Sequence, residues 1–170
     1  AAEKAIAQAD CLIGAKRMLE AAAAPGQTRE EQIAPEKIVE AIAAHPECSR
    51  FTVVMAGDIG FYSGTKKLLP LLSGCDVTLE PGISSLVTLC AKLGTSYEDV
   101  TPVSLHGRNW DIARELRRHK RIFALVGGEK GMENLCRTLV DAGLAEAKVS
   151  VGEALGYPQE KITVGTAQSL

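Results

Sequence analysis

The chain has 170 residues, of which 46% are apolar and 24% are charged, and its formal net charge is −2. This composition is typical of a packed globular protein and excludes an intrinsically disordered chain. The near-neutral charge provides no field that would attract nucleic acid, and no apolar run reaches the roughly 18 residues of a membrane span. We therefore expect a cytoplasmic protein without a nucleic-acid or membrane partner.

Short apolar segments alternate with segments of helical periodicity, which is the pattern of βαβ units and predicts an α/β fold. In chain order the expected helices are 1–9, 15–20, 35–44, 63–72, 84–93, 111–119 and 132–142. The expected strands are 11–13, 51–56, 76–79, 100–105, 121–126, 148–151 and 162–166. Pro35 suits a first helical turn, and Gly74, Gly94 and Gly143 stand where left-handed C-terminal caps belong.

The segment 106–111 interrupts this alternation and carries the single tryptophan. We therefore predict a lobe boundary there, with an N-terminal α/β lobe over 1–107 and a C-terminal α/β lobe over 108–170. The chain opens on a helix and stops soon after a strand. We expect the first lobe to lack its first strand and the second lobe to lack its last.

Five cysteines are scattered along the chain, with no CxxC pair and no histidine at metal-ligand spacing. We expect reduced, mostly buried thiols and no metal site.

The strand at 51–56 runs into a glycine-rich loop, and ligands of open α/β sheets bind at such carboxyl strand ends. Gly57 and Gly60 would let the main chain approach a ligand closely, and Asp58 could accept a hydrogen bond from an amine or a ribose hydroxyl. A helix start capped by Asp58 or Ser63 is the alternative interpretation.

Two later junctions carry further candidates. Pro81 and Gly82 form a turn before Ser84 and Ser85, whose hydroxyls could bind a ligand or simply cap the next helix. The strand at 100–105 leads to Arg108, which could bind a carboxylate bidentately or be a solvated surface residue.

Several common motifs are missing from the sequence, namely GxxxxGK[ST], GxGxxG and GxSxG. Their absence argues against a P-loop nucleotidase, a dinucleotide oxidoreductase and an α/β-hydrolase. His106 has no serine or cysteine partner placed by a motif, so it is a weak candidate for direct catalysis.

Four segments taken together resemble the tetrapyrrole methylases: GDIGFYSGTK at 57–66, EPGISS at 80–85, SLHGR at 104–108 and VGEALGYPQE at 151–160. Within that family they are most similar to the precorrin-6Y and cobalt-precorrin-7 C5-methyltransferases of cobalamin biosynthesis. The resemblance spans nearly the whole chain, and the order and spacing of the four segments are more specific than any one of them.

The resemblance implies a two-lobed tetrapyrrole-methylase-like fold, with a mostly parallel N-terminal sheet and a smaller mixed sheet in the C-terminal lobe. It also implies a homodimer that binds S-adenosylmethionine between the lobes and releases S-adenosylhomocysteine. The residues implied to bind this cofactor are Ala56, Gly57, Asp58, Phe61, Ser84, Ser85, Val126 and Ala154. Ile59 replaces the proline usual in the family's Gly-Asp-Pro loop, which keeps an N–H and loosens the backbone. The family's Gly-x-Gly-Pro-Gly loop, which usually contributes to the cleft, would stand before the start of this chain.

The implied substrate is a corrin-type tetrapyrrole with several carboxylates. Arg108 is the first candidate to bind them, with His106 also on the substrate side and Lys66 and Arg17 as further cations. Methyl transfer from a sulfonium depends mainly on placement, so the shortage of acid–base residues fits. A separate domain or protein would methylate C15 and remove a carboxylate.

Two other functions stay open from the sequence. The chain could be another tetrapyrrole-methylase relative, acting on uroporphyrinogen, diphthine or ribosomal RNA, although FYSG and SLHGR argue against this. It could also be a non-catalytic subunit that binds an adenosyl ligand or docks a partner.

Overall fold

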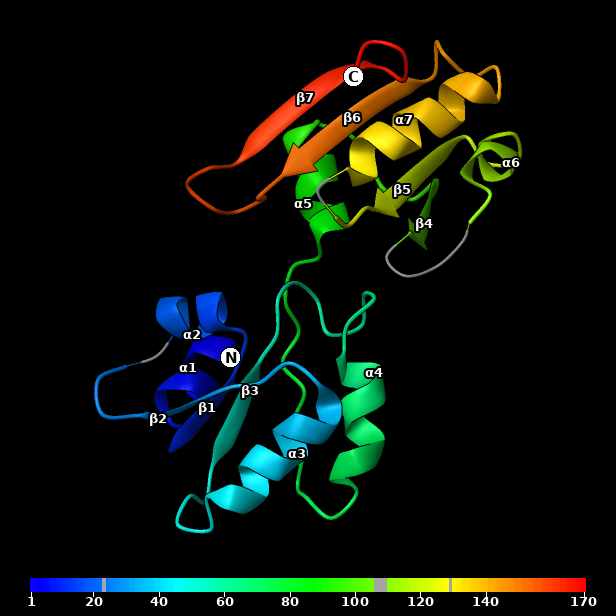
Figure 1. The fold of residues 1–170 in the computed structure, drawn as a ribbon. Coiled ribbons are helices and arrows are strands. Elements are labelled where there is room, and N and C mark those ends of the chain that lie inside the picture. Colours follow the sequence, from blue (N-terminus) through cyan, green and yellow to red (C-terminus); the bar gives the residue numbers. More distant parts are fainter. Residues whose placement is uncertain (23, 106–109, 129) are drawn as a thin grey trace. The chain divides into compact units, whose positions relative to one another are not determined.

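The computed structural model describes residues 1–22, 24–105, 110–128 and 130–170, which divide into two compact units, Ala1–Ser84 and Ser85–Leu170 (Figure 1). The elements of the first unit are α1 (Ala2–Ala7), β1 (Cys11–Gly14), α2 (Lys16–Ala22), β2 (Thr28–Glu31), α3 (Pro35–Ala44), β3 (Phe51–Val54), α4 (Thr65–Leu68) and the 3-10 helix η1 (Leu69–Leu72). The elements of the second are α5 (Ser85–Lys92), β4 (Val100–Ser104), α6 (Ile112–Leu116), β5 (Arg121–Leu125), α7 (Gly131–Asp141), β6 (Lys148–Glu153) and β7 (Lys161–Thr166).

The sheet of the first unit is parallel, with the strand order β2-β1-β3. Central β1 is buried along its whole length, as expected of a parallel strand covered on both faces. In register, Gly14 at its end lies beside Val54 at the end of β3. The carboxyl ends of β1 and β3 therefore meet at one edge of the sheet.

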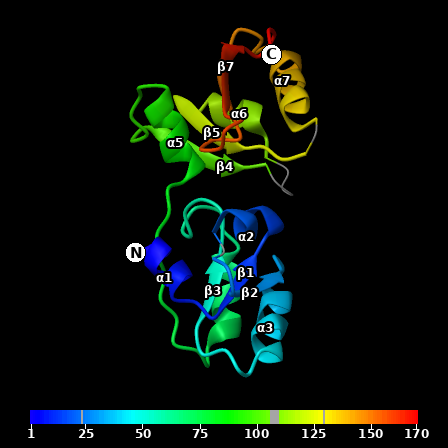
Figure 2. The same cartoon turned by 90° about the vertical axis from the view of Figure 1, so that its left-hand side faces the viewer.

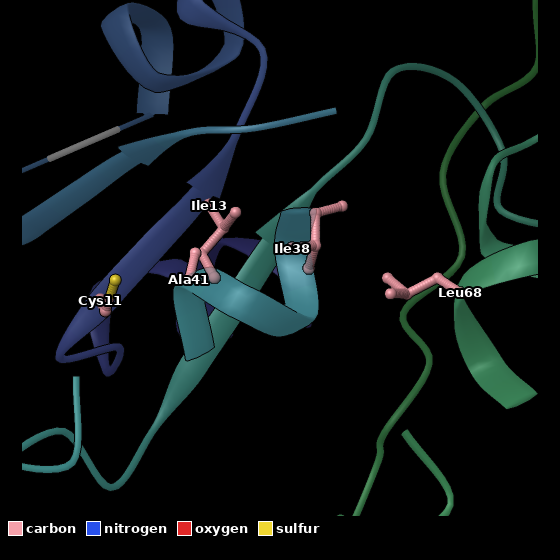
Figure 3. Packing of buried hydrophobic residues seen from close by; sticks show 5 residues of the cluster. All are labelled: Cys11, Ile13, Ile38, Ala41 and Leu68. Carbon is pink, nitrogen blue, oxygen red and sulfur yellow. The ribbon is translucent and has the colours of Figure 1, made fainter. Parts of the chain in front are cut away.

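The alternation of side chains along β1 divides the core of this unit between the two faces of the sheet. Cys11 and Ile13 pack with Ile38 and Ala41 of α3 and Leu68 of α4 (Figure 3). Leu12 points to the other face, where it packs with residues of α1 and α2 and those beside them. Figure 2 shows α1 and α3 on opposite sides of the sheet. The three-stranded sheet is thus a middle layer between helices.

The second unit contains two small sheets in its described residues. Strands β4 and β5 are parallel, and β6 and β7 are antiparallel. Its core joins both sheets to the helices through Val103, Ile112, Leu139 and Ala167. The mixed sheet expected from the resemblance is therefore realised here as one parallel pair and one antiparallel pair.

The boundary between the units differs from the predicted one. The predicted boundary after residue 107 lies outside the described residues, whereas the division by contacts falls between Ser84 and Ser85. The reason is that β4 pairs along its full length with β5, which ties residues 100–104 to the second unit. We therefore assign α5 and β4 to the second unit.

Most expected elements are present. The predicted helix at 35–44 coincides with α3, which begins on Pro35, and Gly94 and Gly143 adopt the left-handed conformation expected of helix caps. Gly74 does not, so that prediction is wrong. The described part of the chain holds no helix long and apolar enough to cross a bilayer.

One predicted strand is absent, and one observed strand was not predicted. Residues 76–79 form no strand, and Val77 and Leu79 are instead exposed. Strand β2, with the sequence TREE, was missed because all four of its residues are polar, although it pairs in parallel with the buried strand β1. A polar edge strand leaves no apolar periodicity to detect.

Candidate functional site

The loop after β3 contains four of the predicted cofactor residues and is held by its own hydrogen bonds. Oδ1 of Asp58 accepts from the backbone N–H of Gly60 at 2.6 Å, and the N–H of Phe61 donates to the carbonyl of Asp58 at 3.1 Å. Gly57 has a φ of 74°, a conformation that favours glycine. The loop therefore presents Ala56 and Gly57 as exposed main chain next to a fixed carboxylate.

The far end of this loop is anchored on a methionine sulfur. The hydroxyls of Ser63 and Thr65 donate to Sδ of Met55 at 3.3 and 3.2 Å. The Ser63 hydroxyl also accepts from the N–H of Thr65, at the start of α4. The N-cap residue of α4 is Gly64, and no side chain makes a cap hydrogen bond there, so neither Asp58 nor Ser63 caps this helix as the alternative interpretation expected.

A second predicted loop lies against the first. A Cβ added to Gly82 would collide with the carbonyl oxygen of Gly57, so the two main chains approach as closely as only glycine allows. Ser84, two residues later, is buried with 6% of its surface exposed. The structure therefore brings Gly57 and Asp58 of the first loop against the segment that leads into Ser84. No sequence pattern indicated this contact.

The other predicted cofactor residues belong to the second unit. Ser85 begins α5, Val126 follows β5, and Ala154 follows β6. Ala154 has a φ of 47°, which is unusual for a residue with a side chain. Close by, a Cβ added to Gly152 would lie 3.0 Å from the end of the Leu89 side chain of α5 and 2.9 Å from the end of the Leu155 side chain. The start of the 151–160 segment is thereby packed on α5.

Of the four residues predicted to face the substrate, the structure describes two. His106 and Arg108 lie outside the described residues. Lys66 is exposed on α4, and Arg17 is exposed on α2.

Burial raises the pKa of the Cys11 thiol to about 11, which makes it a core residue rather than a nucleophile.

A cavity of about 240 Å³ opens at the carboxyl ends of β1 and β3, within the first unit. Its lining includes Gly14, Arg17, Ile33, Met55, Ala56 and Tyr62. Ile33 was not predicted as a site residue, since an isolated apolar residue in a loop carries no pattern, and Tyr62 was noted only as part of the FYSG segment. Arg17 and Ala56 were selected for different roles, and the cavity connects them.

The family model for Tetrapyrrole (Corrin/Porphyrin) Methylases matches residues 1–170. The chain belongs to the tetrapyrrole methylase family. A precorrin-6Y C(5,15)-methyltransferase [decarboxylating] from Sinorhizobium sp is 30% identical over 98% of this chain, which spans only 41% of that relative. A cobalt-precorrin-7 C(5)-methyltransferase from Salmonella typhimurium is also 30% identical, over 95% of this chain and 80% of its own length.

Solved structures of tetrapyrrole methylases share the fold of this chain. The precorrin-6Y methylase from Archaeoglobus fulgidus aligns with a TM-score of 0.72 at 22% identity, over 99% of this chain and 82% of that one. Uroporphyrin-III C-methyltransferase from Thermus thermophilus, complexed with S-adenyl homocysteine, aligns with a TM-score of 0.68 at 18% identity, over 98% and 75%. The resemblance and fold class predicted from the sequence are confirmed.

The described loops fit an adenosyl ligand of the kind this family uses. The exposed main chain of Ala56 and Gly57 offers backbone groups without bulky side chains, and the Asp58 carboxylate can accept from an amine or a hydroxyl. The partly buried ring of Phe61 adds an apolar surface beside them. The described residues contain no cluster of three or more histidine, cysteine, aspartate or glutamate side chains suited to a metal ion.

Proposed function

We propose that this protein is an S-adenosylmethionine-dependent methyltransferase that methylates C5 of a corrin precursor of the precorrin-6Y or cobalt-precorrin-7 type. The observation that carries the proposal is the close approach of Gly82 to Gly57 and Asp58, which supports a shared cofactor site for the two loops at the end of β3. Family membership gives the reaction class. The two 30% identical relatives are each named for C5 methylation, and this supports C5 as the position.

The cofactor-binding roles follow from the chemistry of each residue. The main chain of Ala56 and Gly57 and the carboxylate of Asp58 would hold the polar part of the cofactor, with Phe61, Ser84 and Ser85 beside them. Val126 and Ala154 would contribute from the second unit. S-adenosylmethionine would supply an electrophilic methyl group on a good leaving group.

Placement carries the chemistry in this proposal. Transfer of a methyl group to an electron-rich ring carbon needs the two carbons about 3–3.5 Å apart and in line with the departing sulfur. The transfer itself requires no strong acid or base, because the sulfonium is already a good leaving group. The protein's task is to fix both molecules rigidly.

The wider assignments belong to the same proposal. Arg108 and His106 would face the substrate, and the protein would act in the cytoplasm as a homodimer. The Sinorhizobium relative is named for both C5 and C15 methylation and is much longer than this chain. We therefore assign the C15 methylation and decarboxylation to a separate domain or protein.

The test is calorimetric titration of S-adenosylhomocysteine into the protein and into Asp58→Asn. Asparagine keeps an oxygen for the Gly60 N–H but loses the charge, so it should fold normally. We expect the dissociation constant to rise about tenfold or more, the cost of a charge-assisted hydrogen bond. The matched control is Asp76→Asn, an exposed aspartate outside both loops, which should bind like the parent. Absence of binding by the parent protein, or equal binding by both variants, would contradict the proposal.

A further inference from the structure

The cavity at the ends of β1 and β3 has a buried apolar floor and an exposed mouth. Gly14 and Ile38 lie at the floor and are buried, and Val53 and Met55 are partly buried. Arg17, Ile33 and Tyr62 line the same cavity and are exposed. The cavity thus runs from solvent into the carboxyl edge of the sheet, where ligands of α/β proteins bind.

The chemistry of the mouth is mixed. Ile33 has 75% of its surface exposed and Tyr62 has 44%, which are large values for apolar side chains. Arg17 adds a guanidinium, whose planar fork matches a carboxylate. An aliphatic group, an aromatic ring and a cation around one opening suit a ligand that joins an apolar framework to a carboxylate.

Tyr62 connects this cavity to the proposed cofactor loop. Its φ of 50° is a left-handed conformation that costs free energy for a residue with a side chain, and such strain is retained where the ring position matters. Its ring meets that of Phe61 edge-on, with centroids 5.1 Å apart. Ala56 lines the cavity and also belongs to the loop, so the two compartments share a wall.

We propose that this cavity receives one carboxylate-bearing side chain of the tetrapyrrole substrate, with Arg17 binding the carboxylate and Ile33 and Tyr62 contacting the adjoining ring edge. The volume of about 240 Å³ is below that of pockets that enclose whole drug-sized ligands, so only a side chain enters. The inference rests on the proposed function. It assigns Arg17 as a residue that fixes the orientation of the macrocycle.

The test is a titration of the protein, in the presence of S-adenosylhomocysteine, with a corrin heptacarboxylate (cobyrinic acid) and with its heptamethyl ester. The variants are Arg17→Gln, Arg17→Lys and the matched control Lys16→Gln. Lys16 is the exposed neighbour on α2 and does not line the cavity. Since both positions are exposed, thermal melts should show that each of the three variants folds.

We expect Arg17→Gln to weaken binding of the heptacarboxylate about tenfold or more and Arg17→Lys to recover part of the loss. Lys16→Gln should stay within about twofold of the parent, and the ester should bind the parent and Arg17→Gln equally. Equal losses for Arg17→Gln and Lys16→Gln, or no binding of the heptacarboxylate by the parent, would overturn the inference. Titration of S-adenosylhomocysteine alone separates the two proposals. If the parent does not bind this ligand, the proposed function is contradicted. If Arg17→Gln changes its dissociation constant, the proposed role of Arg17 in substrate binding is contradicted.

Discussion

At the scale of single residues, Gly14 sets the spacing between the two strands that end at the cavity. A Cβ at this position would lie 2.7 Å from the carbonyl oxygen of Val54, and the residue is buried. Gly14→Ala must therefore push β1 and β3 apart or strain the backbone. We predict that it lowers the free energy of unfolding in urea by about 1–3 kcal/mol.

The control for this prediction is Gly74→Ala. A Cβ on Gly74 meets nothing within 4 Å, and its backbone is not left-handed. Its free energy of unfolding should stay within about 0.5 kcal/mol of the parent. Similar losses for the two variants would show that the contact with Val54 does not matter.

Ala154 provides a second residue-scale prediction, because its backbone is left-handed and its side chain is exposed. Valine should lower the free energy of unfolding by about 1 kcal/mol or more, since a β-branched residue is poorly tolerated at positive φ. Glycine should leave it within about 0.5 kcal/mol, because relief of strain offsets the added chain entropy. At exposed Ala43 of α3 the glycine variant should instead cost about 1 kcal/mol. Loss of stability in Ala154→Gly as large as in Ala43→Gly would contradict the strained backbone.

The sequence predicted the glycines of the candidate site but not its strained residues. Gly57 and Gly82 follow apolar or turn-forming segments, which is where glycine indicates a close backbone approach. Tyr62 and Ala154 adopt left-handed conformations that tyrosine and alanine rarely adopt, so nothing in their identity indicates them.

At the scale of elements, a histidine joins the end of α3 to β2. The ring of His45 makes hydrogen bonds of 2.8 Å with Glu30 of β2 and 2.9 Å with Glu47. Hydrogen bonding to Glu30 and then to Glu47 raises the pKa of His45 above its usual value. Only the protonated ring has an N–H on each nitrogen for both carboxylates.

The resulting prediction is a pH-dependent stability. Because the folded pKa lies above the unfolded value of about 6.5, the stabilisation is fully present below that pH and is lost as the pH rises through the raised pKa. In chemical denaturation, the free energy of unfolding of the parent should exceed that of His45→Gln, and the difference should be larger at about pH 6 than at about pH 9. His119→Gln, which removes a histidine 3.3 Å from a single glutamate, is the control. If the difference in free energy of unfolding between the parent and His45→Gln did not depend on pH, the proposed role of the protonated His45 ring would be contradicted.

Elements with a local signal were the ones that the sequence predicted well. Pro35 marks the start of α3, and the apolar residues of β1 identify a buried strand. Apolar and polar residues alternate over 76–79 as they do in a strand, but this segment has no partner strand in the described chain. Without a partner, the alternation alone does not make a strand. Strand β2 shows the reverse, because its register with β1 makes a strand of four polar residues.

At the scale of the whole molecule, the order of four motifs was more informative than any local pattern. Their spacing predicted the tetrapyrrole methylase family, which the match over residues 1–170 confirms. The division between units was not predictable in the same way. It depends on the pairing of β4 with β5, which joins segments distant in the sequence. No sequence pattern near Ser84 indicates this pairing.

The most direct test of the central claim is to follow the methyl group itself. The protein is incubated with S-adenosylmethionine carrying a carbon-13 methyl group and with precorrin-6Y or cobalt-precorrin-7, and the product is examined by carbon-13 NMR. We predict a new signal from a methyl group on C5, formed more slowly by Asp58→Asn and at the parental rate by Asp76→Asn. A labelled methyl group on another ring carbon, or no transfer to either substrate, would contradict the account.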